Sequence, residues 1–124
     1  MIFFFRAGGV EVHDGFHDTQ GRTADVVLST VKSALSSSGY KKVLVTGMFS
    51  NSSSFPLVPD TQYHCHLGHS LGGAVALLDA TMLKMQIPSV EIDLVTFGMP
   101  RVGNQKFADM IDSIVSSTSE PSLI

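Results

Sequence analysis

Five residues near the middle of the chain, Gly68-His-Ser-Leu-Gly72, have the pattern G-x-S-x-G. This pattern is typical of a sharp strand-to-helix turn that presents a serine hydroxyl as a nucleophile. Glycines are needed on either side because larger side chains would collide with the strand or the helix. An apolar run that begins at Ala74 follows, as expected for a buried helix. The pattern therefore predicts that Ser70 is a nucleophile.

The strand that should lead into this turn is separated from it in the sequence. Residues 41–46 are rich in β-branched side chains and predict a strand, but residues 48–67 intervene before Gly68. Three consecutive serines and two prolines indicate that the intervening segment is a loop. Without residues 48–68 the sequence reads Val-Leu-Val-Thr-Gly-His-Ser-Leu-Gly-Gly-Ala, which is a strand that runs directly into the serine turn.

We interpret residues 48–67 as an insert derived from a retained intron. Gly47-Met-Phe49 can be encoded with the splice-donor sequence GTATGT, and Leu67-Gly68 with an acceptor AG. Pro59-Asp60 can supply the branch-point-like sequence CTGAC. The intervening length corresponds to twenty-one codons, or 63 bases, so its removal keeps the reading frame. The alternative is an ordinary surface insertion, which loops tolerate well.

The composition is that of one globular domain. The chain has 124 residues, of which 44% are hydrophobic and 15% charged. A net charge of −3 gives no basic surface for nucleic acid. The lone Cys65 excludes a disulfide framework within the chain. The apolar start, Met1-Ile-Phe-Phe-Phe-Arg6, is too short for a signal peptide, and no run approaches the length of a transmembrane helix.

Hydrophobic spacing predicts that strands and helices alternate along the chain. The expected elements are a short strand at 11–16, a polar turn at 18–21, a helix at 24–38 between a Thr23 cap and Gly39, a strand at 41–46, a helix at 71–85, a strand at 91–97, a helix capped by Asn104, and a frayed tail at 116–124. This order favours an α/β fold in which helices cover both faces of a parallel sheet. Residues 1–124 are expected to form one partial domain.

Three blocks resemble the fungal-type triacylglycerol lipases (lipase class 3), a branch of the α/β-hydrolases that also includes feruloyl esterases. They are Val12-His-Asp-Gly-Phe16, the two halves Val43-Leu-Val-Thr-Gly47 and His69-Ser-Leu-Gly-Gly-Ala74, and Val95-Thr-Phe-Gly-Met-Pro-Arg-Val-Gly-Asn104. The resemblance implies a partial α/β-hydrolase, a parallel sheet fragment with flanking helices. It also implies hydrolysis of acylglycerol esters at a lipid interface, without a cofactor.

By this resemblance Ser70 attacks the ester carbonyl, and the backbone N–H of Leu71 donates one oxyanion hydrogen bond. His69 would pack beneath the turn and would not act as the base. Members of the family are typically secreted. Acyl-chain preference, and the choice between lipase and feruloyl esterase, stay open because the lid and acyl-pocket segments are not in this sequence.

The sequence departs from the family pattern where the rest of the catalytic triad should follow. Triad chemistry of this type needs an Asp and then a His after the serine, and no histidine follows His69. None of the later carboxylates occupies the family's acid position; they are Asp79, Glu91, Asp93, Asp109, Asp112 and Glu120. The strand that carries the second oxyanion donor should precede Glu11. We therefore expect a chain truncated at both ends and inactive by itself.

The remaining histidines are expected to have no catalytic role. For His13 and His17 a structural role in a turn near the sheet is favoured. His64, Cys65 and His66 lack a second pair at ligand spacing, so no zinc site is predicted. An alternative of a different class is a non-catalytic lipase-like chain that binds lipid or a partner protein through exposed sheet edges.

Overall fold

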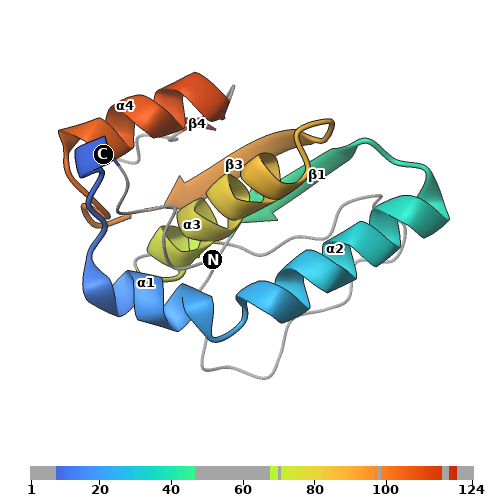
Figure 1. Cartoon of the computed structure of the whole chain (residues 1–124), viewed down its shortest axis with the longest axis horizontal. Coiled ribbons are helices and arrows are strands. Elements are labelled where there is room, and N and C mark those ends of the chain that lie inside the picture. The colour runs from blue at the N-terminus through green and yellow to red at the C-terminus, as the bar shows by residue number, and fades with distance from the viewer. Residues whose placement is uncertain (1–7, 47–67, 70, 98, 116–117, 120–124) are drawn as a thin grey trace.

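The computed structural model describes residues 8–46, 68–69, 71–97, 99–115 and 118–119. Four helices and four strands lie in these ranges, and Figure 1 shows their arrangement. In chain order they are α1 (Asp14–Gly21), α2 (Ala24–Ser38), β1 (Lys42–Thr46), β2 (Gly68–His69), α3 (Leu71–Gln86), β3 (Glu91–Phe97), α4 (Gln105–Ile114) and β4 (Thr118–Ser119).

Strand β3 is the organising strand of the sheet, because each of the other three strands pairs with it in parallel. β1 pairs along five positions, from Lys42 opposite Glu91 to Thr46 opposite Val95. β2 pairs with Thr96 and Phe97. The two strands expected at 41–46 and 91–97 are therefore parallel neighbours in one sheet, and the predicted parallel α/β fold is confirmed.

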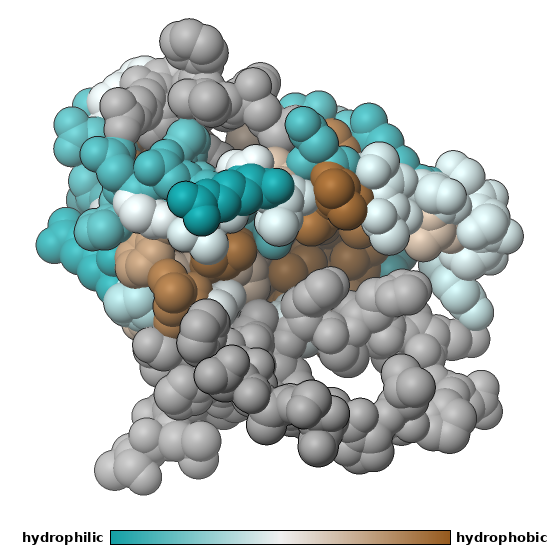
Figure 2. Space-filling model, turned by 90° about the horizontal axis from the view of Figure 1, so that it is seen from below, coloured by the Kyte–Doolittle hydropathy of each residue, from teal (hydrophilic) through white to brown (hydrophobic). Residues whose placement is uncertain are grey.

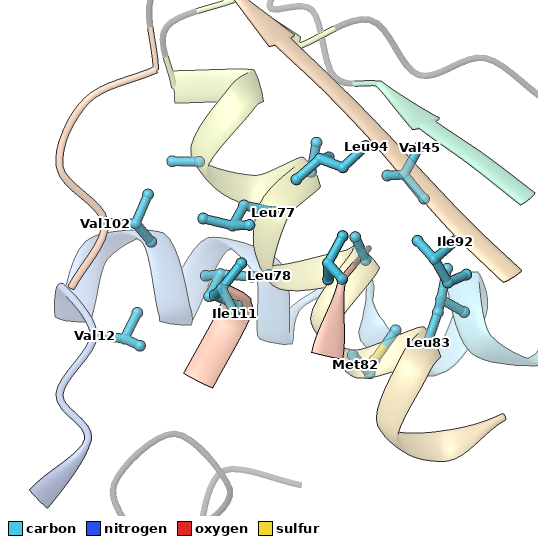
Figure 3. Close-up of a cluster of buried hydrophobic side chains, with 14 of the residues drawn as sticks. Val12, Val45, Leu77, Leu78, Met82, Leu83, Ile92, Leu94, Val102 and Ile111 are labelled. Atoms are coloured by element: carbon cyan, nitrogen blue, oxygen red, sulfur yellow. The ribbon is translucent and has the colours of Figure 1, made fainter. Parts of the chain in front are cut away.

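Helix α3 forms the centre of the hydrophobic core. Its sequence is apolar on nearly all sides, so the helix has neighbours around most of its circumference. It packs against β3, β1 and α1, and Leu78 and Leu83 on it are almost fully buried. Figure 3 shows side chains from α3, β1 and β3 meeting in this cluster, together with Val12, Val102 and Ile111. The fold therefore depends on the helix that follows the serine turn.

Helix α2 has the amphipathic pattern of a surface helix. Val27, Leu28, Val31 and Leu35 are half-buried against the core, and serines and Lys32 lie on its exposed side. Seen from below the view of Figure 1, apolar side chains gather in a band beside the hydrophilic ones (Figure 2). None of the helices in the described ranges is long and apolar enough to cross a membrane.

The predicted ends of α2 are only partly right. Gly39 ends the helix in the left-handed conformation, with φ of 72°, as a glycine stop predicts. Thr23 occupies the cap position, but its side chain donates to the carbonyl of Gln20 and does not cap the helix. The cause is the short connection from α1, since Gln20 lies one turn before Thr23.

The short strand expected at 11–16 and the polar turn expected at 18–21 are both wrong, because α1 occupies Asp14–Gly21. His13 caps this helix by accepting a hydrogen bond from the Gly15 N–H at Nδ1, 3.2 Å away. Such a local side-chain cap favours helix start over an extended chain. Before this helix, Val12 forms an isolated antiparallel bridge with Gly103.

The tail expected to be frayed at 116–124 contains a short strand. Thr118 and Ser119 form β4 and pair with Leu94 and Val95 of β3. The edge of β3 opposite β1 offers unpaired backbone groups, which explains why a serine-rich sequence pairs there. Residues 116–117 and 120–124 of the tail lie outside the described residues.

Candidate active site

The serine motif lies at the junction of β2 and α3. Gly68 and His69 pair with the last two residues of β3, and Leu71 is the first residue of α3. Ser70 lies between these two elements and is outside the described residues. The arrangement strand, serine, helix at the carboxyl end of a parallel sheet is the context that the G-x-S-x-G motif requires.

The start of α3 provides backbone donors beside the motif. The first four N–H groups of a helix have no carbonyl partner within the helix, and Leu71 is the first residue of this one. The helix dipole adds a partial positive charge at the same end. Gly73 is buried, so the backbone of this turn lies close to its neighbours. The Leu71 N–H therefore belongs to the group of donors that could stabilise a developing oxyanion.

Two buried threonines lie at the carboxyl ends of the neighbouring strands. Thr46 is the last residue of β1 and is 2% exposed, and Thr96 of β3 is 6% exposed. Within the described part of the chain, the Thr46 Oγ1 is the buried side-chain oxygen that has no hydrogen-bond partner. Buried hydroxyls without a partner are uncommon because they cost free energy. The end of β1 is thus a buried polar position whose side-chain oxygen has no partner among the described residues.

Asn104 joins two segments that are far apart in the sequence. Its Oδ1 accepts from the N–H of Phe107, at 3.0 Å, and from the N–H of Glu11, at 3.2 Å. Its Nδ2 donates to the carbonyl of Gly9, at 2.8 Å. The sequence predicted only the cap at the start of α4. The links to Glu11 and Gly9 were missed, because no local pattern reveals a partner more than ninety residues away.

Gly103 allows the same two segments to approach closely. A Cβ at this position would lie against the Glu11 carbonyl oxygen and 2.8 Å from the Phe107 ring. The N–H of His13 donates to the carbonyl of Val102, at 2.8 Å, on the other side of the bridge. The first and third blocks of the family resemblance therefore meet here, and we call residues 9–13 with 102–104 the Asn104 junction.

Two of the three histidines within the described ranges, His13 and His17, have structural positions. His13 caps α1, and its ring lies 4.7 Å from that of Phe16. His17 is 8% exposed, and its Nδ1 lies 3.7 Å from a carboxylate oxygen of Asp18. These contacts support the structural roles expected from the sequence. His64, Cys65 and His66 lie outside the described residues.

The carboxylates that follow the motif contact structural partners. Asp79 accepts a hydrogen bond from the Gln20 Nε2 at 3.0 Å, which links α3 to the buried end of α1. Asp109 accepts from Gln105 one helical turn earlier, at 2.8 Å. Asp112 is exposed on α4, and Glu120 lies outside the described residues.

Lys42 binds the other two carboxylates at the opposite end of the sheet. Its Nζ lies 3.1 Å from Glu91 and 2.8 Å from Asp93. The Lys42 ammonium donates hydrogen bonds to Asp93 and to Glu91, and these bonds, the one to Asp93 first, raise the pKa of Lys42 above its ordinary value of 10.5. Because these groups lie at the amino ends of β1 and β3, they are remote from the serine motif along both strands.

A pocket of about 470 Å³ opens beside the carboxyl end of β3. It is lined by Leu94 and Thr96 of β3, by residues 99–104, and by Phe107 and Ile111 of α4. Thr96 is also the residue that pairs with Gly68 of the serine motif. The pocket, the motif and the Asn104 junction are thus grouped at one end of the sheet.

Comparison with known proteins places the chain beside lipases. A family model described as Lipase (class 3) matches residues 60–120. The lipase of Rhizomucor miehei is 33% identical over 108 residues, which cover 85% of this chain and 24% of that protein. Secreted mono- and diacylglycerol lipase 1 of Fusarium solani is 32% identical over 103 residues, which cover 83% of this chain and 24% of that protein.

A solved structure gives the same relationship. The triacylglyceride lipase structure from Rhizomucor miehei superposes with a TM-score of 0.63 and 31% identity. The superposition covers 83% of this chain and 32% of that one. The chain spans about a quarter or less of the length of the curated relatives it matches.

Proposed function

The chain belongs to the class 3 lipase family, the fungal-type triacylglycerol lipases, and we propose that it carries the nucleophile-bearing part of a carboxylic-ester hydrolase. The observation behind this proposal is the junction of β2, Ser70 and α3. A G-x-S-x-G motif lies there between a strand that pairs with the end of β3 and the amino terminus of a buried helix. The relationship to lipases supports acylglycerol esters as the substrate class.

The proposed reaction proceeds through an acyl-enzyme. The Ser70 oxygen attacks the ester carbonyl carbon while its proton passes to a general base. The bond to the alcohol oxygen then breaks, and the alcohol leaves with that proton. Water attacks the acyl-Ser70 carbonyl in the second half, releases the carboxylic acid and restores the hydroxyl. The Leu71 N–H and the positive end of α3 stabilise the oxyanion in both halves.

We further propose that this 124-residue polypeptide, expressed alone, does not turn over esters. His13 caps α1, and His17 is buried with its Nδ1 beside Asp18. The carboxylates of Asp79, Glu91, Asp93 and Asp109 bind structural partners. A serine without a base is a weak nucleophile. Deleting residues 48–68 would not supply the base, so that change alone leaves the polypeptide inactive. Turnover of a nitrophenyl ester that Ser70→Ala abolishes would contradict this proposal.

A chimera tests the family function directly. The matching segment of Rhizomucor miehei lipase is replaced by residues 10–115 of this chain, with residues 48–68 removed. The host then provides the remaining groups of the site. We expect the chimera to hydrolyse a short-chain nitrophenyl ester and an acylglycerol, and Ser70→Ala to reduce turnover by at least about 10⁴-fold.

Two alternatives are outcomes of the same experiment. Lipid binding by a folded chimera in which Ser70→Ala changes no rate would favour a non-catalytic, lipid-binding chain. Faster hydrolysis of a feruloyl ester than of an acylglycerol would favour the feruloyl-esterase branch.

The relatives from Fusarium and Gibberella are named as secreted lipases, and on that basis we propose that the protein acts outside the cell.

A further inference from the structure

Strands β1 and β2 occupy consecutive positions along β3. β1 ends where Thr46 pairs with Val95, and β2 begins where Gly68 pairs with Thr96, the next residue of β3. Both ladders are parallel, so neither strand reverses direction between them. Residues 47–67 separate Thr46 from Gly68 in the sequence, yet the pairing of β3 advances by one residue.

The pairing of β4 limits where β2 can lie. Leu94 and Val95 pair with β1 and also with β4, so these two strands take opposite edges of β3. A strand has two edges, and β2 therefore shares one of them. On the edge of β1, its two residues would extend the β1 ladder without a shift.

We infer that β1 and β2 are two halves of one strand, and that the twenty-one residues 47–67 are an insertion that interrupts this strand in the sequence. The glycines at the two ends of the insertion fix where the two halves of the strand join. Removing residues 47–67 or residues 48–68 gives the same product, because Gly47 and Gly68 are interchangeable. In that product Thr46, one glycine and His69 follow one another opposite Val95, Thr96 and Phe97.

Backbone pairing and codon arithmetic give the same length independently. The register of β3 requires the removal of twenty-one residues for an unbroken ladder. The splice signals compatible with Gly47-Met-Phe49 and Leu67-Gly68 enclose 63 bases, which is twenty-one codons. Neither argument uses the other. Agreement on one number favours a retained intron over a surface insertion of arbitrary length.

Thr46, at the point where β1 ends, is a buried polar residue. Thr46 is 2% exposed, and its Oγ1 has no hydrogen-bond partner among the residues that the structure describes. Val45 beside it is buried in the core with Ile92 and Leu94. Strand residues alternate between faces, so the joined strand puts Val45 and the glycine on one face and Thr46 and His69 on the other. A deletion that is one residue too long or too short would move positions 69 and 70 to the opposite faces of the sheet.

A deletion series in the full chain tests the inference. The three variants lack residues 48–67, residues 48–68 or residues 47–68, which removes twenty, twenty-one or twenty-two residues. All three shorten the connection between Thr46 and His69 by nearly the same number of residues, so the entropic effect of the shortening is matched. They differ in register, because only the middle variant leaves one glycine between Thr46 and His69. Thermal unfolding by circular dichroism measures the result without any ester substrate, so it is independent of the proposed function.

We expect the twenty-one-residue deletion to unfold cooperatively at a temperature no lower than that of the parent chain. The deletions of twenty and twenty-two residues should melt at least about 5 °C lower than it, because each must bulge the strand or shift α3 against β3. Equal melting temperatures for the three variants, or a middle variant that melts below either neighbour, would overturn the inference.

A transcript measurement gives a second, separate test. Amplification across codons 40–75 from the RNA of the source organism should give two products that differ by 63 bases. The shorter product should join the codon of Thr46 to one glycine codon and then to that of His69. If every transcript retains the 63 bases, the intron origin is refuted, and the register argument then depends on the deletion series alone.

Discussion

The two ends of strand β3 are stabilised in different ways. At the amino end, Lys42 bridges Glu91 and Asp93, and these side chains are between 30% and 64% exposed. At the carboxyl end, Thr96 is buried, and Asn104 and Gly103 join segments from opposite ends of the chain. Figure 1 shows that α1, the first turns of α3 and the start of α4 gather at this carboxyl end.

The difference indicates which end holds the functional geometry. Exposed ion pairs are screened by water and contribute little to the free energy of unfolding, so the amino end of β3 tolerates substitution. Buried polar contacts cost much more when one partner is lost, so the carboxyl end is sensitive to substitution. The serine motif lies at the sensitive end, where fixed positions matter most for catalysis.

The largest expected effect comes from placing a charge beside Asp79. Gln20 is 3% exposed and donates to Asp79 from 3.0 Å, so Gln20→Glu would set two carboxylates against each other in the core. We expect the free energy of unfolding to fall by about 3 kcal/mol at pH 7. Urea unfolding measures the loss.

The uncharged variant Gln20→Met is the matched control for this prediction, and it should cost about 1 kcal/mol. Repulsion raises the pKa of the new carboxyl, so the penalty of Gln20→Glu should shrink as the pH falls and that carboxyl becomes protonated. A penalty that does not change with pH would show that charge repulsion is not the cause.

The next effect concerns close packing at the Asn104 junction. Gly103→Ala would place a methyl group against the Glu11 carbonyl and the Phe107 ring, so we expect a loss of about 2 kcal/mol. Gly21→Ala is the matched control, because a Cβ there meets nothing within 4 Å. The control should change stability by less than about 0.5 kcal/mol. Similar melting curves for both variants would argue against a tight junction.

A smaller effect is expected for the hydrogen bonds of Asn104. Asn104→Ala removes the helix cap and the links to Glu11 and Gly9, which should cost about 1.5 kcal/mol. Asn104→Asp keeps the accepting oxygen and loses only the donor to Gly9, so it should retain more than half of that stability. If Asp proves as destabilising as Ala, the cap is not the dominant contribution.

The smallest effect is expected at the amino end. Lys42→Met should lower the melting temperature less than any of the destabilising variants above, and the difference from the parent chain should disappear in about 1 M salt. The folded-state pKa of Lys42 is raised above 10.5 by Asp93 and Glu91. Its stabilisation is therefore fully present below pH 10.5 and is lost as the pH rises through the folded pKa. If Lys42→Met lowered the melting temperature strongly at pH 7 and salt did not reduce this effect, the two ends of β3 would not differ in the way described.

Local patterns predicted the elements at both ends, because the determinants of an element lie within it. The helical spacing from Ala24 and the left-handed stop at Gly39 gave α2, and the apolar run before Gly98 gave β3. The V-H-D-G-F block was misread as a strand. Its conformation depends on the His13 cap and on a bridge from Val12 to Gly103 that no local pattern reveals.

Contacts between distant segments could not be predicted from the sequence. Gln20 and Asp79 are 59 residues apart, and Glu11 and Asn104 are 93 apart. The sequence offers many polar residues at such distances, and only packing selects the pairs that meet. The nucleophile differs from these pairs, because the G-x-S-x-G motif is local. Leu71 was correctly predicted at the helix start, while the catalytic role of Ser70 stays a prediction.

The most direct measurement of the central claim is active-site labelling of the lipase chimera that carries residues 10–115 without residues 48–68. A fluorophosphonate should add one phosphonyl group per chain, located on Ser70 by mass spectrometry of the peptide that contains it. Ser70→Ala should leave the chimera unlabelled, and the isolated 124-residue polypeptide should also remain unlabelled. Label on another residue of the chimera, or stoichiometric label on Ser70 of the isolated polypeptide, would contradict this account.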